Sequence, residues 1–313
     1  MSATASASRQ SSPPKRLIAL DFDGVLIDSV GESSLSALEA ARQLWGEAVI
    51  PSDAALESAG RRKKLLADMA YVRPCVETGY ENIVQIRLLL GGMDPEHLLR
   101  NWRGKKDGEE GELQRAMQRW QLDRAALVKL FGDVRDAWIA RDLEGWLAPN
   151  ATYGVEISQA VRACLDCPDT EVFVVTTKQA QFSAALLKGL AGLPELGEEE
   201  QEKTSPHPGE GGYKRIVSTT LSGRPKVAVL EELRAAHAAA AGATRCVFVE
   251  DKLSTLETTA KRFAERGETN PWEMLLVDWG YNTDDERARA RALGIEVVGR
   301  ERFREALLGG KGV

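Results

Sequence analysis

Residues 17–29 read LIALDFDGVLIDS, an apolar run that ends abruptly at Asp21 and continues through Asp23, Gly24 and Asp28. Continuous apolar runs of this length are typical of a strand buried on both faces of a parallel sheet. Asp21 and Asp23 point the same way on a strand, and a turn at its end can bring both carboxylates to one point. Three carboxylates there need a positive partner, and Mg²⁺, which prefers oxygen ligands, is the natural one. The alternative is an ordinary strand followed by an Asp/Gly turn.

Five later segments repeat the pattern of a short apolar run: 172–175, 216–217, 246–249, 274–277 and 295–298. Segments with helical spacing of apolar residues separate them, at 182–190, 227–241, 253–263 and 284–293. Alternation of strands and helices predicts an α/β fold with a Rossmann-like, doubly wound parallel sheet. Ligands of such sheets bind beyond the carboxyl ends of the strands.

Residues 31–167 contain almost no β-rich runs. The spacing of their apolar residues predicts helices that include residues 35–45, 82–90 and 125–146, and Asp94-Pro95 is a typical helix start. We therefore predict an all-α domain, 31–167, inserted into a core formed by 16–30 and 168–313.

Two segments lack the composition of a packed element. Residues 1–15 are rich in Ser and Ala and contain no acid, which predicts a disordered tail or, alternatively, part of a plastid transit peptide. Residues 194–212 are acidic and rich in Pro and Gly, which predicts a flexible loop within the core.

The composition limits the partners of the protein. The 313 residues include 41 basic and 47 acidic side chains, for a net charge of −6, which argues against nucleic acid and anionic membranes as partners. No run approaches the ~20 apolar residues of a membrane span, and no signal peptide is recognisable, so we expect a cytoplasmic protein. Cys164 and Cys167 form a lone C-x-x-C motif without nearby further ligands, which favours ordinary thiols, and their role stays open.

Other strand ends supply complementary polar groups: Thr176, Thr177 and Lys178 after one strand, Glu250 and Asp251 after another, and Lys226 at a predicted helix start. Taken singly, each fits a solvated strand end or a surface lysine. Their joint appearance at one edge of an α/β sheet predicts a single site. Lys178 and Lys214 are alternatives to Lys226, although neither precedes a helix in the same way.

These segments resemble the four motifs of the haloacid dehalogenase superfamily: DFDGVL, VFVVTTK, the lysine of SGRPK, and VFVEDK. The resemblance covers roughly residues 14–30 and 168–313, and the insertion falls where the superfamily places a helical C1 cap. More narrowly, the chain resembles little-characterised dehalogenase-like hydrolases of plants, algae and cyanobacteria. The segments that carry this likeness are 31–38, 72–90, 247–256 and 275–283.

The resemblance implies a phosphatase that acts on a small phosphorylated metabolite. Asp21 would be the nucleophile that forms an aspartyl-phosphate, and Asp23 the general acid and base. Thr176 would donate a hydrogen bond to the phosphoryl group, and Lys226 would hold the charge of Asp21 and of the phosphate. Carbon–halogen cleavage is disfavoured, because a dehalogenase lacks an aspartate two positions after the nucleophile, whereas this chain has Asp23 there.

The resemblance also implies a Mg²⁺ site formed by Asp21, the backbone carbonyl of Asp23, and Asp251, with Glu250 adjacent. Two other functions stay open. One is phosphotransfer or a mutase reaction through the same intermediate, and the other is a non-catalytic binding or assembly protein that keeps the fold.

Substrate choice would belong to the inserted domain. The polar cluster Arg73, Glu77 and Tyr80, together with Thr177 of the core, is predicted to bind substrate, with Arg73 able to grip a second anionic group. The alternative for each residue of the cluster is an internal salt bridge or a helix cap within the inserted domain.

Overall fold

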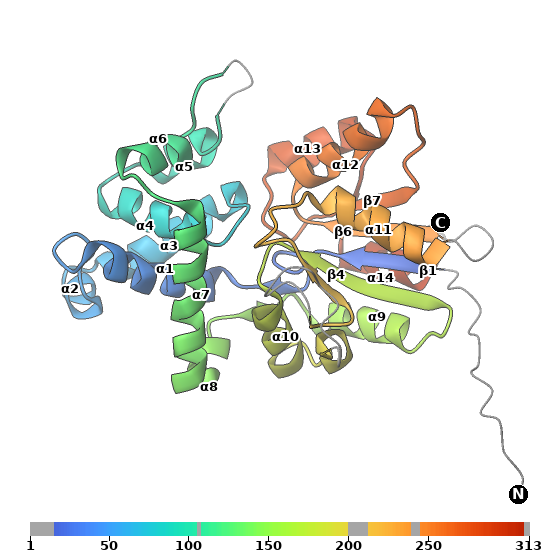
Figure 1. Cartoon of the computed structure of the whole chain (residues 1–313), viewed down its shortest axis with the longest axis horizontal. Helices are drawn as coiled ribbons and strands as arrows, with labels where there is room; N and C mark the ends of the chain where they lie inside the picture. Colours follow the sequence, from blue (N-terminus) through green and yellow to red (C-terminus); the bar gives the residue numbers. More distant parts are fainter. Residues whose placement is uncertain (1–15, 105–107, 200–211, 239–244, 310–313) are drawn as a thin grey trace, which may run out of the picture.

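The computed structural model describes residues 16–104, 108–199, 212–238 and 245–309, which form a sheet flanked by helices and a separate helical domain (Figure 1). The predicted tail, 1–15, and most of the predicted acidic loop, 194–212, lie outside the described residues. The described start of that loop is a short 3₁₀ helix, η2 (Pro194–Gly197), with Leu196 fully buried. No helix within the described ranges is long and apolar enough to cross a membrane.

The sheet has six parallel strands in the order β5-β4-β1-β6-β7-β8. Their bounds are β1 (Arg16–Leu20), β4 (Thr170–Thr176), β5 (Ile216–Ser218), β6 (Arg245–Glu250), β7 (Trp272–Val277) and β8 (Glu296–Val298). Every apolar run that predicted a strand forms one, and the predicted α/β fold class is confirmed.

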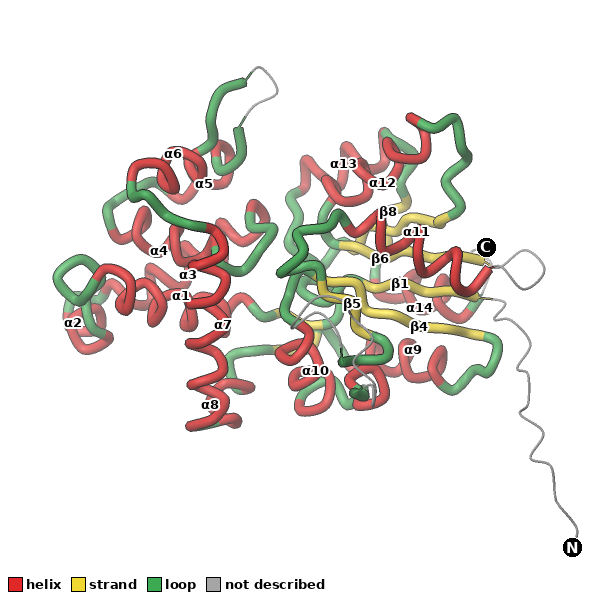
Figure 2. The backbone as a smooth tube through the Cα atoms, viewed as in Figure 1, coloured by secondary structure: helices red, strands yellow, loops and turns green. Residues whose placement is uncertain are grey.

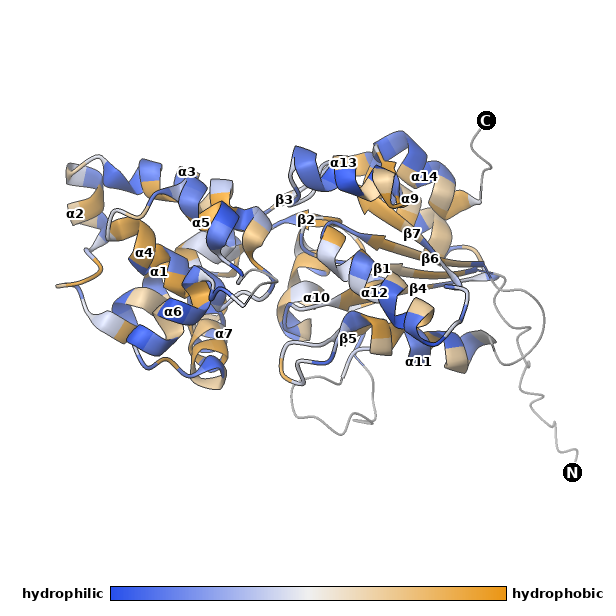
Figure 3. Ribbon diagram, turned by 90° about the horizontal axis from the view of Figure 1, so that it is seen from above, coloured by the Kyte–Doolittle hydropathy of each residue, from blue (hydrophilic) through white to orange (hydrophobic). Residues whose placement is uncertain are grey.

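Helices cover both faces of the sheet. One face packs on α9 (Val155–Leu165), α10 (Ala180–Gly189) and α14 (Arg300–Leu308), and the other on α11 (Lys226–Ala238), α12 (Leu253–Glu265) and α13 (Asp284–Ala292). Alternate residues of β1 enter the two cores: Ile18 and Leu20 on one face, Leu17 and Ala19 on the other. Burial on both faces explains why the strands are continuous apolar runs, coloured orange in Figure 3.

The helical domain faces the carboxyl ends of the strands, with loops between it and the sheet (Figure 2). It comprises α1 (Val30–Trp45), α2 (Asp53–Ser58), α3 (Arg61–Val72), η1 (Arg73–Cys75), α4 (Glu81–Leu90), α5 (Pro95–Asn101), α6 (Glu112–Arg119), α7 (Arg124–Arg141) and α8 (Leu143–Leu147). Its apolar side chains form their own core, which includes Trp102. Two chain segments join it to the sheet, paired as the antiparallel strands β2 (Ile27–Asp28) and β3 (Ala151–Thr152).

Two predicted boundaries are wrong. The predicted insertion ends at residue 167, but α9 belongs to the core because its Ile157 and Val161 pack in the cluster beneath the sheet. The predicted helix 125–146 is two helices, since the backbone of Asp142 leaves helical geometry and its carboxylate caps α8 through the Gly145 amide.

The C-x-x-C motif is divided between two environments. Cys164 is buried on α9, and burial raises the pKa of its thiol to about 11. Cys167 lies after that helix, where the Arg16 guanidinium donates a hydrogen bond to its sulfur. Both thiols are free.

Substitution Ile18→Ala tests the central strand. Ile18 is fully buried, so the lost contacts and the cavity should lower the free energy of unfolding by about 2–5 kcal/mol. Urea unfolding followed by circular dichroism measures the change. Val155→Ala is the control, because Val155 is 68% exposed and its truncation should change stability by less than about 0.5 kcal/mol. Equal losses would contradict the assignment of β1 to the core.

Candidate functional site

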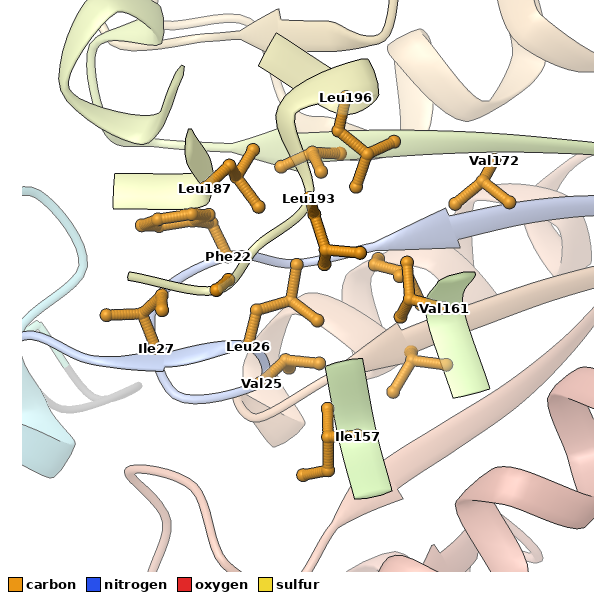
Figure 4. Close-up of a cluster of buried hydrophobic side chains, with 14 of the residues drawn as sticks. Phe22, Val25, Leu26, Ile27, Ile157, Val161, Val172, Leu187, Leu193 and Leu196 are labelled. Atoms are coloured by element: carbon orange, nitrogen blue, oxygen red, sulfur yellow. The ribbon is translucent and has the colours of Figure 1, made fainter. Parts of the chain in front are cut away.

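The site begins at the loop after β1. Phe22, Val25 and Leu26 are buried in the core beneath the sheet, among residues of α9 and α10 (Figure 4). With these apolar side chains anchored, Asp21 and Asp23 lie on the wall of a cavity at the carboxyl edge of the sheet. The Asp21 amide donates to the Val249 carbonyl of β6 at 2.9 Å, so the sheet register also holds this loop.

Gly24 allows the loop to approach β6 closely. Its φ is +88°, a conformation that side chains rarely adopt, and a Cβ atom there would overlap the carboxylate of Asp251. The glycine that follows the two aspartates is therefore required both by the turn and by the contact.

Lys226 joins two of the acidic residues at this edge. Its Nζ lies 2.7 Å from Asp21 Oδ1 and 2.8 Å from Glu250 Oε2, and all three side chains are buried. Burial lowers the pKa of Lys226, but the charges of Asp21 and Glu250 outweigh burial and raise it above its ordinary value. The two carboxylates therefore favour the charged form of Lys226. Of its predicted alternatives, Lys214 lies away from the site and pairs with the exposed Glu198, whereas Lys178 contacts Asp23 rather than Asp21.

Asp21, Glu250 and Asp251 have carboxylate oxygens within 4.8 Å of one another. Burial and the charge of Asp21 raise the pKa of Glu250, and burial is also the main cause that raises the pKa of Asp251. Asp251 Oδ1 is buried and has no hydrogen-bond partner, while its Oδ2 accepts from the Tyr281 amide at 2.8 Å. A buried oxygen without a donor, beside two further carboxylates, fits a hard divalent cation such as Mg²⁺.

Glu250 is already fully engaged within this group. Its Oε2 accepts from Lys226, and its Oε1 accepts from the backbone amides of Asp251 and Lys252. These contacts suit Glu250 to the role of positioning Lys226 better than to its predicted role as a metal ligand.

Asp23 lies beside a second lysine. Its Oδ1 accepts from Ser29 Oγ and lies 3.3 Å from Lys178 Nζ. Burial raises the pKa of Asp23, but the charges of Lys178 and Arg73 and the hydrogen bond from Ser29 outweigh burial and hold that pKa below its ordinary value.

Lys178 continues into a buried ion-pair network with the helical domain. Lys178 Nζ lies 3.6 Å from Glu32 Oε2, and Glu32 binds Arg135 through two hydrogen bonds of 2.7 and 2.8 Å. Glu32 also accepts from the Trp146 indole, and Arg135 stacks on Phe131. The network Asp23–Lys178–Glu32–Arg135 balances two acids against two bases across the boundary between core and helical domain.

A cavity of about 390 Å³ lies between these aspartates and the helical domain. The core lines it with Asp21, Asp23, Thr177, Lys226, Asp251 and Lys252, and the helical domain with Arg73, Glu77, Tyr80, Arg103 and Arg124. All four predicted substrate-binding residues, Arg73, Glu77, Tyr80 and Thr177, thus line one cavity with the predicted nucleophile. This volume falls within the range of small-molecule sites, roughly 300–1,000 Å³.

Thr176 and Thr177 differ in placement. Thr177 lines the cavity, and its hydroxyl donates to the Glu77 carbonyl of the helical domain at 2.8 Å. Thr176 is buried at the end of β4 and does not line the cavity; its hydroxyl oxygen accepts from the Lys178 amide at 3.0 Å. Because no described residue accepts the Thr176 hydroxyl proton, that proton stays available as a donor.

The predicted polar cluster of the helical domain is held by Glu81. This buried carboxylate accepts two hydrogen bonds from Arg103, one from the Trp102 indole, and others from the backbone amides of Glu77 and Thr78. The alternative for this cluster, an internal salt bridge, therefore applies to Glu77 and Glu81, since Arg103 pairs with both, at 3.4 and 2.6 Å. Within the described residues, Arg73 has no such pair.

Solved structures share this architecture. A candidate phosphoglycolate phosphatase from Lactobacillus delbrueckii subsp. bulgaricus has a TM-score of 0.52 at 13% identity, over 94% of this chain and 98% of that one. A predicted phosphatase from Clostridium acetobutylicum has a TM-score of 0.53 at 14% identity, over the same shares. A haloacid dehalogenase-like family protein from Streptococcus pneumoniae overlaps less well, with a TM-score of 0.44 at 13% identity, over 92% and 94%.

The chain therefore shares the fold of the first two of these structures. No family model and no curated protein matches its sequence. At these identities the likeness concerns the fold, and activity has to be argued from the site.

The structure also places residues at this site that sequence reasoning missed. The Tyr281 hydroxyl donates to Asp28 and accepts from the Ser29 amide, and its ring lies under the Arg73 guanidinium. Lys252 donates to backbone carbonyls of Pro74 and Tyr281. Both residues lie within segments singled out for their family resemblance, 275–283 and 247–256, which was the available signal.

Substitution Glu32→Gln tests the buried network. It keeps the shape of the side chain but leaves Arg135 and Lys178 without their buried counter-charge, so the free energy of unfolding should fall by about 3–5 kcal/mol. Chemical denaturation measures the loss. Glu39→Gln, on the exposed face of the same helix, should change stability by less than about 1 kcal/mol. A loss at Glu32 no larger than at Glu39 would show that the network does not stabilise the fold.

Proposed function

We propose that the protein is a Mg²⁺-dependent phosphatase that hydrolyses the phosphate monoester of a small metabolite through an aspartyl-phosphate on Asp21. One observation carries the proposal: Asp21 and Asp23 line the same cavity, with Lys226 2.7 Å from Asp21. A binding protein would have no use for a second, separately held carboxylate beside the first.

In the first step, a carboxylate oxygen of Asp21 attacks phosphorus, and the bond between phosphorus and the ester oxygen breaks. Asp23 gives its proton to the departing alkoxide, which leaves as the alcohol. In the second step, Asp23 takes a proton from water, whose oxygen attacks the phosphorus of the aspartyl-phosphate. Inorganic phosphate leaves, the Asp21 carboxylate is restored, and Asp23 is protonated for the next cycle.

The surroundings of Asp23 suit both roles. Lys178, Arg73 and Ser29 favour its ionised form in the free protein. A bound phosphate dianion adds negative charge beside Asp23, which favours uptake of the proton that the first step needs.

The donor set that would hold Mg²⁺ is Asp21, Asp251 and the backbone carbonyl of Asp23. The ion would offset the repulsion between the anionic nucleophile and the phosphate. We assign Glu250 to positioning Lys226, because its oxygens are engaged by that lysine and by two backbone amides. Sequence reasoning assigned the phosphoryl contact to Thr176, but Thr176 is buried outside the cavity, so Thr177, which lines it, is the better placed of the two threonines.

Substitutions at the two aspartates test the chemistry. Asp21→Asn should reduce phosphate release by at least about 10⁴-fold, since it removes the nucleophile. Asp23→Asn should cost about 10²–10⁴-fold with an alkyl phosphate but much less in the first step with 4-nitrophenyl phosphate, whose leaving group needs no proton. Stopped-flow release of nitrophenol and colorimetric phosphate release measure the two steps.

The intermediate separates the competing functions. After acid quench, mass spectrometry should find phosphate on the peptide that contains Asp21, and more of it in Asp23→Asn. Transfer of phosphate to an added alcohol at the expense of free phosphate would favour a phosphotransferase. Wild-type activity no higher than that of Asp21→Asn, over a panel of phosphorylated metabolites, would favour a binding protein.

Removal of divalent cations tests the proposed Mg²⁺ site at Asp21 and Asp251. Chelation by EDTA should abolish phosphate release, and Mg²⁺ should restore it. Asp251→Asn should raise the Mg²⁺ concentration needed for half-maximal activity by about 10-fold or more, since it removes one carboxylate ligand. Asp285→Asn, an acid at the start of α13 outside this group, is the control. Full activity in EDTA would contradict the proposed metal site.

A further inference from the structure

Six basic side chains line the cavity: Arg73, Arg103, Arg124, Arg224, Lys226 and Lys252. A buried cation normally has an anionic or carbonyl partner for its N–H groups, because leaving it unpaired costs several kcal/mol. The partners of these six side chains therefore show where the cavity still lacks negative charge.

Four of the six are engaged within the protein. Lys226 pairs with two carboxylates, and Lys252 donates to backbone carbonyls of the helical domain and of the loop after β7. Arg103 and Arg224 each make paired hydrogen bonds to one glutamate. None of the four needs a ligand to complete its contacts.

Arg73 is different. It is only 8% exposed, its Nη1 donates to the Val76 carbonyl at 3.2 Å, and its buried Nε has no partner. Within the described residues no carboxylate lies at ion-pair distance from its guanidinium. The ring of Tyr281, 4.1 Å from Cζ, holds the group in place through its face and leaves the edge of the guanidinium free.

The position of Arg73 relates it to one part of the substrate. It lines the main cavity and also a recess of about 30 Å³ beside it, and Asp23 lines both spaces. In the proposed reaction Asp23 protonates the leaving oxygen, so the leaving group has to lie beside Asp23. The alcohol part of the substrate therefore lies on the side of the cavity where Arg73 has N–H groups without an acceptor.

We infer that the leaving alcohol carries an anionic group, a carboxylate or a second phosphate, and that Arg73 binds it through its free N–H groups. This inference rests on the proposed function and names its substrate class: small phosphomonoesters of anionic alcohols. Arg124, the other cavity arginine without a carboxylate partner among the described residues, is exposed and makes a hydrogen bond to the Thr220 carbonyl. It adds positive charge near the cavity without lining the recess beside Asp23.

Matched esters test the inference. The monophosphates of glycolic acid and of glycolamide have the same number of heavy atoms and differ in one negative charge. With Mg²⁺, kcat/KM of the wild type should favour the acid by about 10- to 100-fold, the usual value of a charge-assisted pair of hydrogen bonds. Propane-1,3-diol bisphosphate against propanol monophosphate tests a second phosphate in the same way.

Variants of Arg73 test whether this residue causes the preference for the acid over the amide. Arg73→Gln should bring the ratio of acid to amide to within about 3-fold by lowering kcat/KM for the acid alone, and Arg73→Lys should retain part of it. Arg61→Gln is the control, because Arg61 lies on the exposed surface of the helical domain and donates to the Leu90 carbonyl. Circular dichroism and the urea midpoint check that each variant folds.

Two outcomes would overturn the inference. One is a wild type whose kcat/KM, in both pairs, is the same for the ester with the additional anionic group and for the ester without it. The other is an Arg73→Gln variant that loses activity equally on acid and amide, which would assign Arg73 to the transferred phosphoryl group. If no ester is hydrolysed, the proposed function fails, and calorimetric affinities of the same esters decide the inference: a preference for the acid that Arg73→Gln removes supports it, and equal affinities refute it.

Discussion

The acidic residues at the carboxyl edge of the sheet repel one another, and much of the site is arranged around that repulsion. Asp21, Glu250 and Asp251 are buried together, and burial with their mutual charge raises the pKa values of Glu250 and Asp251. Lys226 offsets part of this repulsion by bridging two of the three. Oδ1 of Asp251 stays buried without a hydrogen-bond partner, which is why the proposed divalent cation is assigned to this group. Replacement of such a cluster by apolar residues would usually stabilise a protein, so its presence indicates chemistry rather than stability.

Charge also ties the helical domain to the core. The same Asp23 that lines the cavity is linked through Lys178 to Glu32 and Arg135, at the base of that domain. On the opposite side, Lys252 donates to backbone carbonyls of η1, and Thr177 donates to the Glu77 carbonyl. These contacts hold residues 73–81 of the helical domain against the cavity that Asp21 and Asp23 line. Charges buried at this boundary interact more strongly than they would in water.

Most of the core and the location of the site could be predicted from the sequence, because both depend on local patterns. A strand buried on two faces has to be apolar throughout, and polar residues directly after such strands have to meet at one edge. The two-residue strands β2 and β3 have no such pattern, so the boundary at α9 was misplaced. The end of α7 at Asp142 was also not predictable from the sequence pattern, since the helical spacing of apolar residues continues across Asp142 and only its capping carboxylate interrupts the helix.

The network around Glu32 was not predictable for a different reason. A glutamate in the first turn of a helix is ordinarily a solvated residue that favours the helix dipole, and only the three-dimensional packing of α1 against α7 buries it beside Arg135. The same holds for Arg73, whose sequence neighbours suggested an internal salt bridge as readily as a ligand site. Two contacts in the folded structure show that Arg73 has free N–H donors. Glu81 accepts hydrogen bonds from Arg103 and not from Arg73, and the ring of Tyr281, more than two hundred residues away, packs on the face of the Arg73 guanidinium. Which cations the protein leaves without a carboxylate partner is thus a property of the assembled cavity and not of any one motif.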